Sequence, residues 1–457
     1  MTQTPSASPA APKEPRPAFA GILSIEKILL ITGIALATLI PSFLVSGLVA
    51  EREQRQREVQ SEFTRNWGPA QRLLTPTLVI PIQNTWSRQY LRIAPTRADM
   101  VAKLAPQERR RGIFSAIVYE SAVDISGEFL VPNATRLQEY LSDKSNRLLW
   151  NEAFIAFGAE ASLPGLRSDN QIEINGAPTA WRPCLEAIRQ EADCRGATLL
   201  LASAQLDGNA AATTSVAFKT TIALRGTGSF AVTNIAKNFS ASVASAWPTP
   251  SFWGEALPAT SNVESDSFDA QWQLSDFGQA RIWTSSNVAD AANWKGPTLG
   301  VTLLEATPIY RMINRVGKYA LLFVALSFAT YLFFEILSHV RIHVLQYGLL
   351  GLSLSLFSLL LLSLSEFIGY TAGYVVSAAL VLAQSSLYTA AVTKRVGPAA
   401  IFAAMLGSLF AFLYVLLGLE TYSLLAGTLA LFVVVSVLMI VTQRVGGLME
   451  PRLSGAG

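Results

Sequence analysis

The stretch YALLFVALSFATYLFFEIL, residues 319–337, holds a single charged side chain, Glu335, and opens an apolar block that runs to residue 443. A helix needs about 20 apolar residues to cross the hydrocarbon core of a bilayer, which is roughly 30 Å thick. The block contains five runs of this kind: residues 319–337, 344–364, 368–392, 398–417 and 422–441. Their connections are short, so neighbouring helices must run antiparallel. The sequence therefore predicts a five-helix transmembrane bundle over residues 319–443.

Charged residues in and after the block indicate which side of the membrane each loop faces. Basic residues occur in alternate loops and in the C-terminal tail: Arg341, Lys394, Arg395, Arg444 and Arg452. The remaining loops carry the acidic residues Glu366 and Glu420. Because Lys and Arg are enriched in short cytoplasmic loops, the pattern predicts that both chain ends are cytoplasmic.

A second hydrophobic segment, residues 28–50, lies far from the bundle. It exceeds the roughly 7–15 apolar residues of a signal peptide and lacks an A-x-A cleavage pattern, which favours a retained anchor over a cleaved signal. The Pro- and Ala-rich residues 1–27 are typical of a disordered cytoplasmic tail, and residues 444–457 form a second tail. One helix before and five after place residues 51–318 outside the cytoplasm, in the periplasm of a Gram-negative bacterium.

Residues 51–318 are predicted to be β-rich. In residues 268–274 apolar side chains alternate with polar ones, a pattern typical of half-buried strands. Residues 73–82 contain Pro76 and Pro81, which predicts edge strands because proline is excluded from central ones. The predicted fold class is a polytopic α-helical membrane protein with six transmembrane helices, one plus five. It carries a large inserted β-rich periplasmic domain, built as a sandwich or as two β-subdomains.

The only two cysteines, Cys184 and Cys194, both fall in this predicted periplasmic domain. Disulfides form and persist in oxidising compartments, so a disulfide between them, closing a small loop, is the favoured interpretation. Two unpaired thiols are the alternative. A metal site is less favoured, because two Cys ligands would still need partners.

Histidine is scarce, and this excludes large classes of enzyme. The chain has two, His339 and His343, both in a predicted cytoplasmic loop. The periplasmic domain therefore lacks the residues for a Ser-His or Cys-His nucleophile pair or a His-ligated zinc. Because the two histidines are four residues apart, they could bind a metal from one face of a helix. A polar role at the membrane interface is favoured. No catalytic, cofactor-binding or metal-ligating residue is predicted, and a net charge of +3 without a basic cluster argues against nucleic acid.

Two acidic residues of the bundle, Glu335 and Glu366, are candidate polar sites in the membrane, where acids are often functional. Glu335 lies close to Arg341 in sequence, so a paired or snorkelling role at the interface is favoured over proton or ion handling. Ser353 and Gln384 can hydrogen-bond between helices. Small residues at four-residue spacing predict close helix packing: Gly369, Gly373 and Ser377.

Several motifs occur in a characteristic order along the chain. They are GP at residues 68–69, LVIP at 78–81, WPTPSFWGEALP at 247–258, FDAQW at 268–272, KYA at 318–320, FFE at 333–335, QYGL at 346–349 and LSEFIG at 364–369. Over about residues 28–443 the chain thereby resembles the CreD family of bacterial inner-membrane proteins. Phe367 and Thr75 depart from the family pattern, where a histidine and a glycine are expected. The resemblance implies a role in envelope integrity, toxin tolerance and a stress response linked to the cell wall, and it implies no catalytic residues.

The favoured function is that of a non-enzymatic inner-membrane protein whose periplasmic domain binds an envelope protein or ligand. The candidate interaction surface consists of Trp247, Pro248, Pro250, Phe252, Trp253, Gly254, Pro258, Phe268 and Trp272. A purely structural corner is the alternative interpretation of these residues. A transporter or permease using the six-helix bundle is the alternative function, and a hydrolase using Glu264, Asp266 and Asp269 ranks third. The lipid bilayer is a predicted partner, and homo-oligomerisation is left open.

Overall fold

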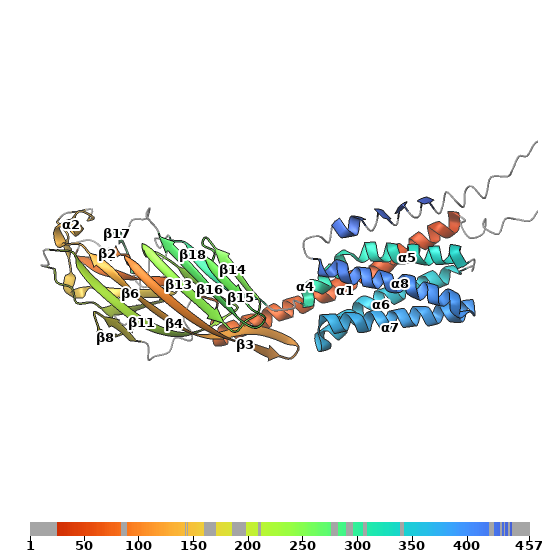
Figure 1. The fold of residues 1–457 in the computed structure, drawn as a ribbon, viewed down its shortest axis with the longest axis horizontal. Coiled ribbons are helices and arrows are strands. Elements are labelled where there is room, and N and C mark those ends of the chain that lie inside the picture. Colours follow the sequence, from red (N-terminus) through yellow and green to blue (C-terminus); the bar gives the residue numbers. More distant parts are fainter. Residues whose placement is uncertain are drawn as a thin grey trace, which may run out of the picture. The chain divides into compact units, whose positions relative to one another are not determined.

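The computed structural model describes most of the chain. The described residues are 25–83, 89–141, 143, 145–159, 171–184, 198–208, 212–275, 282–288, 296–304, 309–338, 342–419, 425–429, 432–433, 435–436 and 439–440. They belong to two compact units (Figure 1), which we call the helical unit, Met1–Gln54 with Thr307–Gly457, and the β unit, Arg55–Ala306. The predicted tails, residues 1–27 and 444–457, lie almost wholly outside the described residues.

The helical unit is built from long apolar helices. They are α1 (Ile25–Trp67), which continues into the β unit, α4 (Ile309–Lys318), α5 (Ala320–Ser338), α6 (Val344–Ile368), α7 (Tyr370–Thr393) and α8 (Val396–Gly418). Contacts join α6 to α7, α7 to α8 and α8 to α5 (Figure 1). Within the described residues, four helices are long and apolar enough to cross a membrane, namely Leu29–Trp67, α6, α7 and α8, and α5 offers the shorter apolar stretch Leu322–Leu332. The predicted span at residues 422–441 is described only in fragments.

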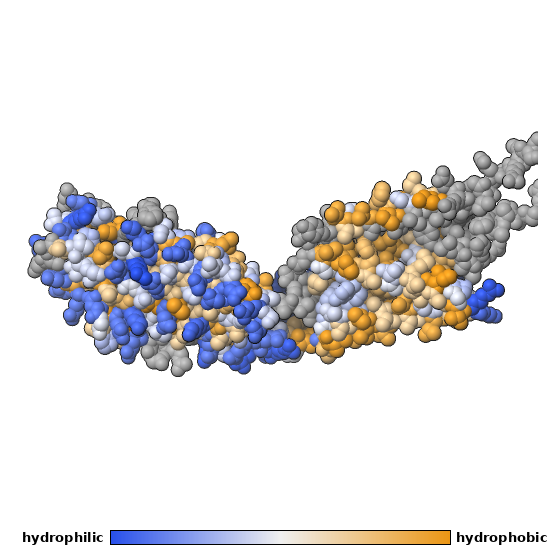
Figure 2. All heavy atoms as spheres, viewed as in Figure 1, coloured by the Kyte–Doolittle hydropathy of each residue, from blue (hydrophilic) through white to orange (hydrophobic). Residues whose placement is uncertain are grey.

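The surface of the helical unit is apolar, as contact with lipid requires. Large side chains point outward on several helices: Phe43 is 74% exposed, Leu345 67%, Leu387 72% and Val396 80%. Figure 2 shows these helices largely covered by hydrophobic residues, whereas hydrophilic residues dominate the visible face of the β unit. Soluble proteins rarely expose apolar patches of this extent, so the composition of this surface fits a bilayer.

Small residues allow α6 and α7 to approach closely. Gly369 joins the two helices with φ +82°, a left-handed conformation that favours glycine. A Cβ at Gly373 would lie 2.7–2.9 Å from atoms of Ser365, including its backbone nitrogen. Ser377 is fully buried and donates to the Gly373 carbonyl at 2.7 Å. The structure therefore places Gly373 and Ser377 in the helix packing expected of them, with Gly369 at the turn.

Strands of the β unit form two sheets. The ten-stranded sheet has the order β14 (Pro250–Gly254), β18 (Thr298–Leu303), β12 (Ser229–Thr233), β1 (Gln71–Gln83), β6 (Phe154–Ala159), β10 (Thr198–Ser203) and β9 (Arg182–Pro183), with β2 (Gln89–Ile93), β5 (Arg147–Leu148) and β17 (Ile282–Ser285) attached off this path. The eight-stranded sheet has the order β15 (Thr260–Val263), β16 (Phe268–Ser275), β13 (Asn238–Ser245), β3 (Arg97–Arg111), β4 (Phe114–Val131), β11 (Thr214–Thr227), β7 (Gln171–Ile174) and β8 (Ala177–Ala180). Two short helical elements, α2 (Ala134–Gln138) and η1 (Trp150–Glu152), join strands.

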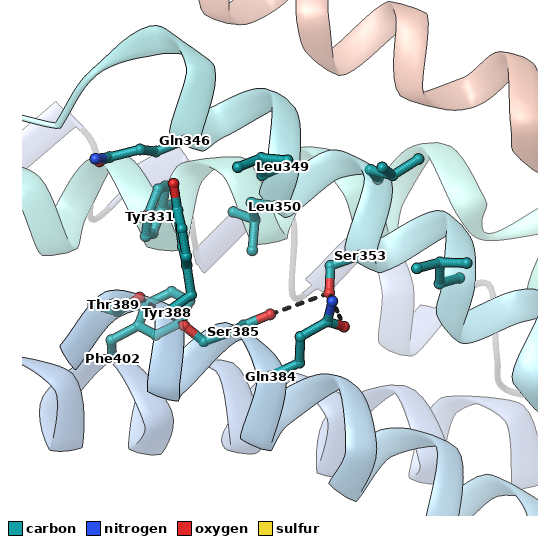
Figure 3. A pocket seen from close by; sticks show the side chains of 12 residues that line it. Tyr331, Gln346, Leu349, Leu350, Ser353, Gln384, Ser385, Tyr388, Thr389 and Phe402 are labelled. Carbon is teal, nitrogen blue, oxygen red and sulfur yellow. Dashed lines mark hydrogen bonds between the residues drawn. The ribbon is translucent and has the colours of Figure 1, made fainter. Parts of the chain in front are cut away.

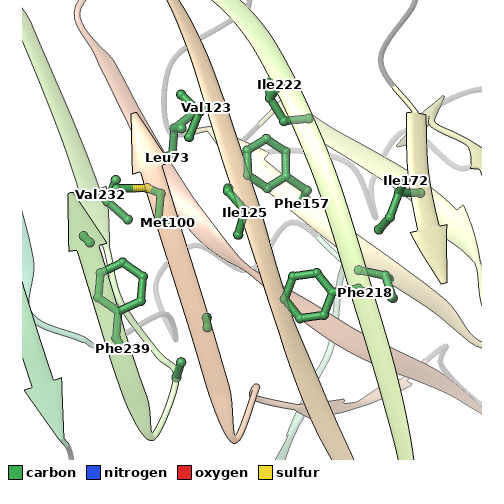
Figure 4. Packing of buried hydrophobic residues seen from close by; sticks show 14 of the residues in the cluster. Leu73, Met100, Val123, Ile125, Phe157, Ile172, Phe218, Ile222, Val232 and Phe239 are labelled. Carbon is green, nitrogen blue, oxygen red and sulfur yellow. The ribbon is translucent and has the colours of Figure 1, made fainter. Parts of the chain in front are cut away.

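A shared hydrophobic core holds the two sheets together. Leu73, Phe157 and Val232 of the ten-stranded sheet share one buried cluster with Ile125 and Phe218 of the eight-stranded sheet (Figure 4). Burying a side chain of this kind stabilises the fold by about 1.5–3 kcal/mol. Of the two predicted arrangements, the structure has the sandwich.

The prediction of edge strands at residues 73–82 was wrong. They form β1, which lies inside the ten-stranded sheet between β12 and β6. Pro76 is tolerated there because the register with β6 shifts between Leu74 and Thr77, and a bulge removes the need for an N–H at that position. The part of β1 that pairs with β6 ends at Val79, and the part that pairs with β5 begins at Ile82. Pro81 falls between these two parts.

Candidate functional site

A buried charge pair lies inside the helical unit. Glu335 on α5 is fully buried, and its Oε1 accepts from the Lys27 Nζ of α1 and from the Ile342 N–H at 3.0 Å. Its Oε2 accepts from the Tyr347 hydroxyl at 2.8 Å. A buried carboxylate is stable only when it is paired and hydrogen-bonded. Glu335 is therefore paired, but with Lys27 in the interior; Arg341, the partner suggested by sequence, lies outside the described residues.

Aromatic rings surround this pair and connect it to the other helices. The ring centroids of Tyr331 and Tyr347 are 4.9 Å apart, and those of Tyr331 and Phe402 are 5.1 Å apart. Phe334 also packs on Phe402, at 5.6 Å. The charge pair and the rings together join α1, α5, α6 and α8. Sequence reasoning missed this constellation, because no local pattern links Lys27 to Glu335.

A groove of about 260 Å³ opens between α6 and α7 (Figure 3). Its lining combines apolar and polar side chains: Tyr331, Gln346, Leu349, Leu350, Leu352, Ser353, Leu356, Gln384, Ser385, Tyr388, Thr389 and Phe402. The Ser353 hydroxyl donates to the Gln384 Oε1 at 3.1 Å and lies 3.4 Å from the Ser385 hydroxyl. The hydrogen bond expected between Ser353 and Gln384 thus forms, and it lies in a cavity that the sequence did not indicate.

Glu366, the second candidate acid, lies near the C-terminal end of α6. The Tyr310 hydroxyl of α4 donates to its Oε1 at 3.0 Å, and the Arg52 Nε of α1 lies 3.7 Å from the same oxygen. Glu366 therefore links α1, α4 and α6 within the helical unit. Its neighbour Phe367, one of the two departures from the family pattern, is 77% exposed.

Residues 247–258 connect the edges of the two sheets. They contain β14, which ends the ten-stranded sheet, and they lead directly into β15, which ends the eight-stranded sheet. The Trp247 Nε1 donates to the Leu304 carbonyl at 2.9 Å, and a Cβ at Gly300 would meet the Trp253 ring at 2.5 Å. Trp247 and Trp253 thus anchor the segment on β18 and on Leu304, which follows that strand.

Two members of the predicted interaction surface are core residues, which corrects their assignment. Phe268 is 3% exposed and Trp272 is 2% exposed. Phe252 packs edge-on against both, with ring centroids 5.8 Å away, and the Trp272 Nε1 donates to the Ala256 carbonyl at 3.2 Å. Phe268 and Trp272 therefore hold the loop onto the sandwich and cannot offer a free face to a partner.

The exposed part of this region is the loop after β14 together with β15. Leu257 is 66% exposed, and every residue of β15 is exposed. Glu255 accepts from the Thr298 N–H at 2.8 Å, and this hydrogen bond lowers the pKa of Glu255. The carboxylates of the third-ranked hydrolase hypothesis lie along the β15–β16 hairpin, with Glu264 and Asp266 in solvent.

The remaining predicted residues are only partly described. Cys184 is buried and disulfide-bonded; Cys194 lies outside the described residues, so the pairing of the two stays a prediction. His339 also lies outside them. His343 is the N-cap of α6, where its Nδ1 accepts from the Leu345 N–H at 3.2 Å. Within the described part of the chain, no three His, Cys, Asp or Glu side chains gather as metal ligands would.

Comparison with known proteins gives a family and one curated relative. The family model described as "Inner membrane protein CreD" matches residues 24–446. The Inner membrane protein CreD of Escherichia coli (strain K12) is 28% identical over 436 residues, which is 90% of this chain and 91% of the relative. Both matches therefore include the helical unit and the β unit.

Among solved structures, two crystal structures of an M1 zinc metallopeptidase from Deinococcus radiodurans are similar to part of the chain. Each is 9% identical and covers 46% of this chain and 42% of the peptidase, with TM-scores of 0.22 and 0.21. At such scores the likeness carries no argument about fold or activity. The family match covers both units, and together with the apolar helices it establishes that this chain belongs to the CreD family of inner-membrane proteins.

Proposed function

We propose that this chain supports the integrity of the cell envelope, and tolerance to envelope-active toxins, by binding an envelope partner through its β unit. In this proposal six helices cross the inner membrane, both termini are cytoplasmic and the β unit lies in the periplasm. The basic residues Lys394 and Arg395 at the exposed α7–α8 connection, together with Glu366 at the opposite end of α6, support the orientation. The family match supports the inner-membrane location.

The observation that carries the binding role is the open edge at β15. Four strands end the two main strand orders, and three of them contain proline: Pro250 in β14, Pro183 in β9 and Pro178 in β8. Proline on an edge strand blocks the addition of a further strand. β15 contains none, and among the described strands it pairs with β16 alone. It is therefore the edge best suited to receive another strand.

Backbone donors of β15 point toward that open side. The Glu264 N–H donates to the Ser267 carbonyl at 2.8 Å, and hydrogen-bonded pairs recur at every second residue of an antiparallel ladder. Asn262, opposite Asp269, is therefore the next hydrogen-bonded residue. The N–H groups of Ser261 and Val263 consequently point away from β16, where an extended peptide could accept from them.

Acidic side chains beside this edge favour one kind of partner. Glu264 and Asp266 lie at the turn of the β15–β16 hairpin, and Asp269 lies opposite Asn262 on β16. Opposite charges across neighbouring strands stabilise their pairing, whereas like charges oppose it. We therefore expect the partner to present an extended segment that carries Lys or Arg.

Crosslinking with Ser261→Pro tests this proposal in the full-length chain. Leu257→Cys is labelled in spheroplasts with a membrane-impermeant maleimide that carries a photo-crosslinker, and the adducts are identified. Ser261→Pro removes an outward N–H but no β15–β16 hydrogen bond, so it should reduce the adduct about tenfold. Ser261→Ala keeps that N–H and should leave the adduct unchanged.

The possible failures of this experiment are distinguishable. If Leu257→Cys is not labelled from outside, the periplasmic location of the β unit is wrong. If it is labelled but no adduct forms, partner binding at this edge is wrong. An equal yield from Ser261→Pro and Ser261→Ala would show that the partner does not add as a strand.

Transport is a second candidate function, favoured by the groove between α6 and α7 and by the buried Glu335 near it. If Glu335 carries a proton or ion, Glu335→Gln should abolish substrate flux into proteoliposomes that contain the chain. Tyr347→Phe removes one hydrogen bond to Glu335 but keeps the carboxylate, so it is the matched control. Flux that survives Glu335→Gln would remove Glu335 from any transport mechanism.

A further inference from the structure

The groove between α6 and α7 has the shape and position of a site for one lipid molecule. Leu349, Leu352 and Leu356 line it and are 43%, 55% and 39% exposed. Their spacing places them along one side of α6. Together they form an apolar wall that runs along the helix axis, as an acyl chain does in a bilayer.

Polar side chains occupy the end of the groove nearest the helix termini. Gln346 lies in the first turn of α6, and Tyr388 and Thr389 lie near the end of α7 (Figure 3). Because α6 and α7 are antiparallel neighbours, these residues lie at about the same depth. The groove is thus polar at the end nearest the helix termini, and further in Leu352 and Leu356 line it together with the hydrogen-bonded pair Ser353 and Gln384.

Hydrogen-bonding groups in the groove are incompletely paired. The Gln346 Oε1 is buried and, among the described residues, has no donor. Gln384 is exposed, and its Oε1 accepts from Ser353. A buried acceptor that has no donor is costly to the fold. A ligand that donates to the Gln346 Oε1 would satisfy this acceptor.

Positive charge lies just beyond the polar end. Lys394, the C-cap of α7, and Arg395 are both exposed. Lys394 follows Thr389 by five residues, about 7.5 Å along a helix axis at 1.5 Å per residue. That offset is comparable to the distance between the ester groups of a phospholipid and its phosphate, so a lipid in the groove would place its phosphate near these two cations.

We propose that the groove binds one phospholipid whose head group carries an N–H or O–H donor, such as ethanolamine or glycerol. One acyl chain lies along Leu349, Leu352 and Leu356, with the ester groups at the depth of Tyr388 and Thr389. The head group donates to Gln346, and the phosphate lies beside Lys394 and Arg395. Phosphatidylcholine has the same chains and phosphate but no donor in its head group, so it binds more weakly.

Native mass spectrometry of the full-length chain tests this site. The chain is purified in detergent and exposed to phosphatidylethanolamine, phosphatidylglycerol or phosphatidylcholine with identical acyl chains. We expect one ethanolamine or glycerol lipid to be retained about tenfold better than the choline lipid, the effect of one hydrogen bond made in place of an unpaired buried group. Gln346→Leu should lower retention of the first two lipids to the choline level.

A matched pair of variants separates the groove from the rest of the lipid-facing surface. Leu356→Trp fills the groove and should abolish retention of a single lipid. Leu359 lies on the same helix and is also 39% exposed, but it does not line the groove. Leu359→Trp should therefore retain lipid normally. Equal retention by these two variants, or equal retention of all three lipids by the unaltered chain, would overturn the proposal. Circular dichroism and gel filtration confirm that each variant is folded.

Discussion

Lys27→Met is expected to destabilise the helical unit by about 3–5 kcal/mol, because it leaves the Glu335 carboxylate buried without its cation. Glu335 is 0% exposed, and the two groups that remain bonded to it, the Ile342 N–H and the Tyr347 hydroxyl, are neutral. The measurement is the melting temperature of the full-length chain in detergent, followed by gel filtration after heating. A loss of this size corresponds to a fall on the order of 10 °C.

A double variant separates charge from packing in this prediction. In Lys27→Met with Glu335→Gln, the amide still accepts from the Ile342 N–H and still reaches the Tyr347 hydroxyl, while no charge is left buried. Replacing both members of a buried ion pair by neutral groups is often close to neutral in stability. The double variant should therefore regain most of the lost melting temperature, and a double variant as unstable as Lys27→Met alone would contradict the paired role.

Sequence reasoning located the helices well because the bilayer restricts the alternatives. Every backbone group in hydrocarbon must be bonded internally, so length and composition alone define a span. The predicted spans 344–364, 368–392 and 398–417 accordingly fall within a few residues of α6, α7 and α8. The predicted anchor at residues 28–50 likewise lies within α1 (Ile25–Trp67).

Contacts between distant parts of the chain could not be predicted from the sequence. Lys27 and Glu335 are 308 residues apart, and no local pattern joins them, so the nearer Arg341 was chosen. The central position of β1 was missed for a similar reason, because it depends on a register shift against β6 that only the assembled sheet defines. The groove between α6 and α7 depends equally on how two helices pack.

The aromatic residues near the sheet edges show how a correct pattern can be given a wrong role. Alternation in residues 268–274 placed Phe268 and Trp272 on one apolar face, and the structure buries that face. Their place beside a Pro-rich motif led to an interaction surface instead. The proposed partner edge is instead β15, a run of four exposed residues, three of them polar, that carries no motif.

Trp272→Ala is expected to destabilise the β unit by about 3–5 kcal/mol, the usual cost of truncating a buried tryptophan. The change leaves the Ala256 carbonyl without the indole donor and removes the ring against which Phe252 packs. Pulse proteolysis of the full-length chain in increasing urea measures the effect. Trp253→Ala, which removes a half-buried ring of β14, should cost clearly less and serves as the control.

Trp272→Phe distinguishes a structural tryptophan from one that binds a partner. Phenylalanine keeps most of the ring volume but lacks the N–H that bonds to Ala256, so it should recover more than half of the lost stability. Because this loop leads directly into β15, crosslinking from Leu257→Cys should fall with stability in Trp272→Ala and return in Trp272→Phe. A Trp272→Ala chain that resists proteolysis normally but yields no adduct would instead mean that the tryptophan touches the partner, and the core assignment of this face would be wrong.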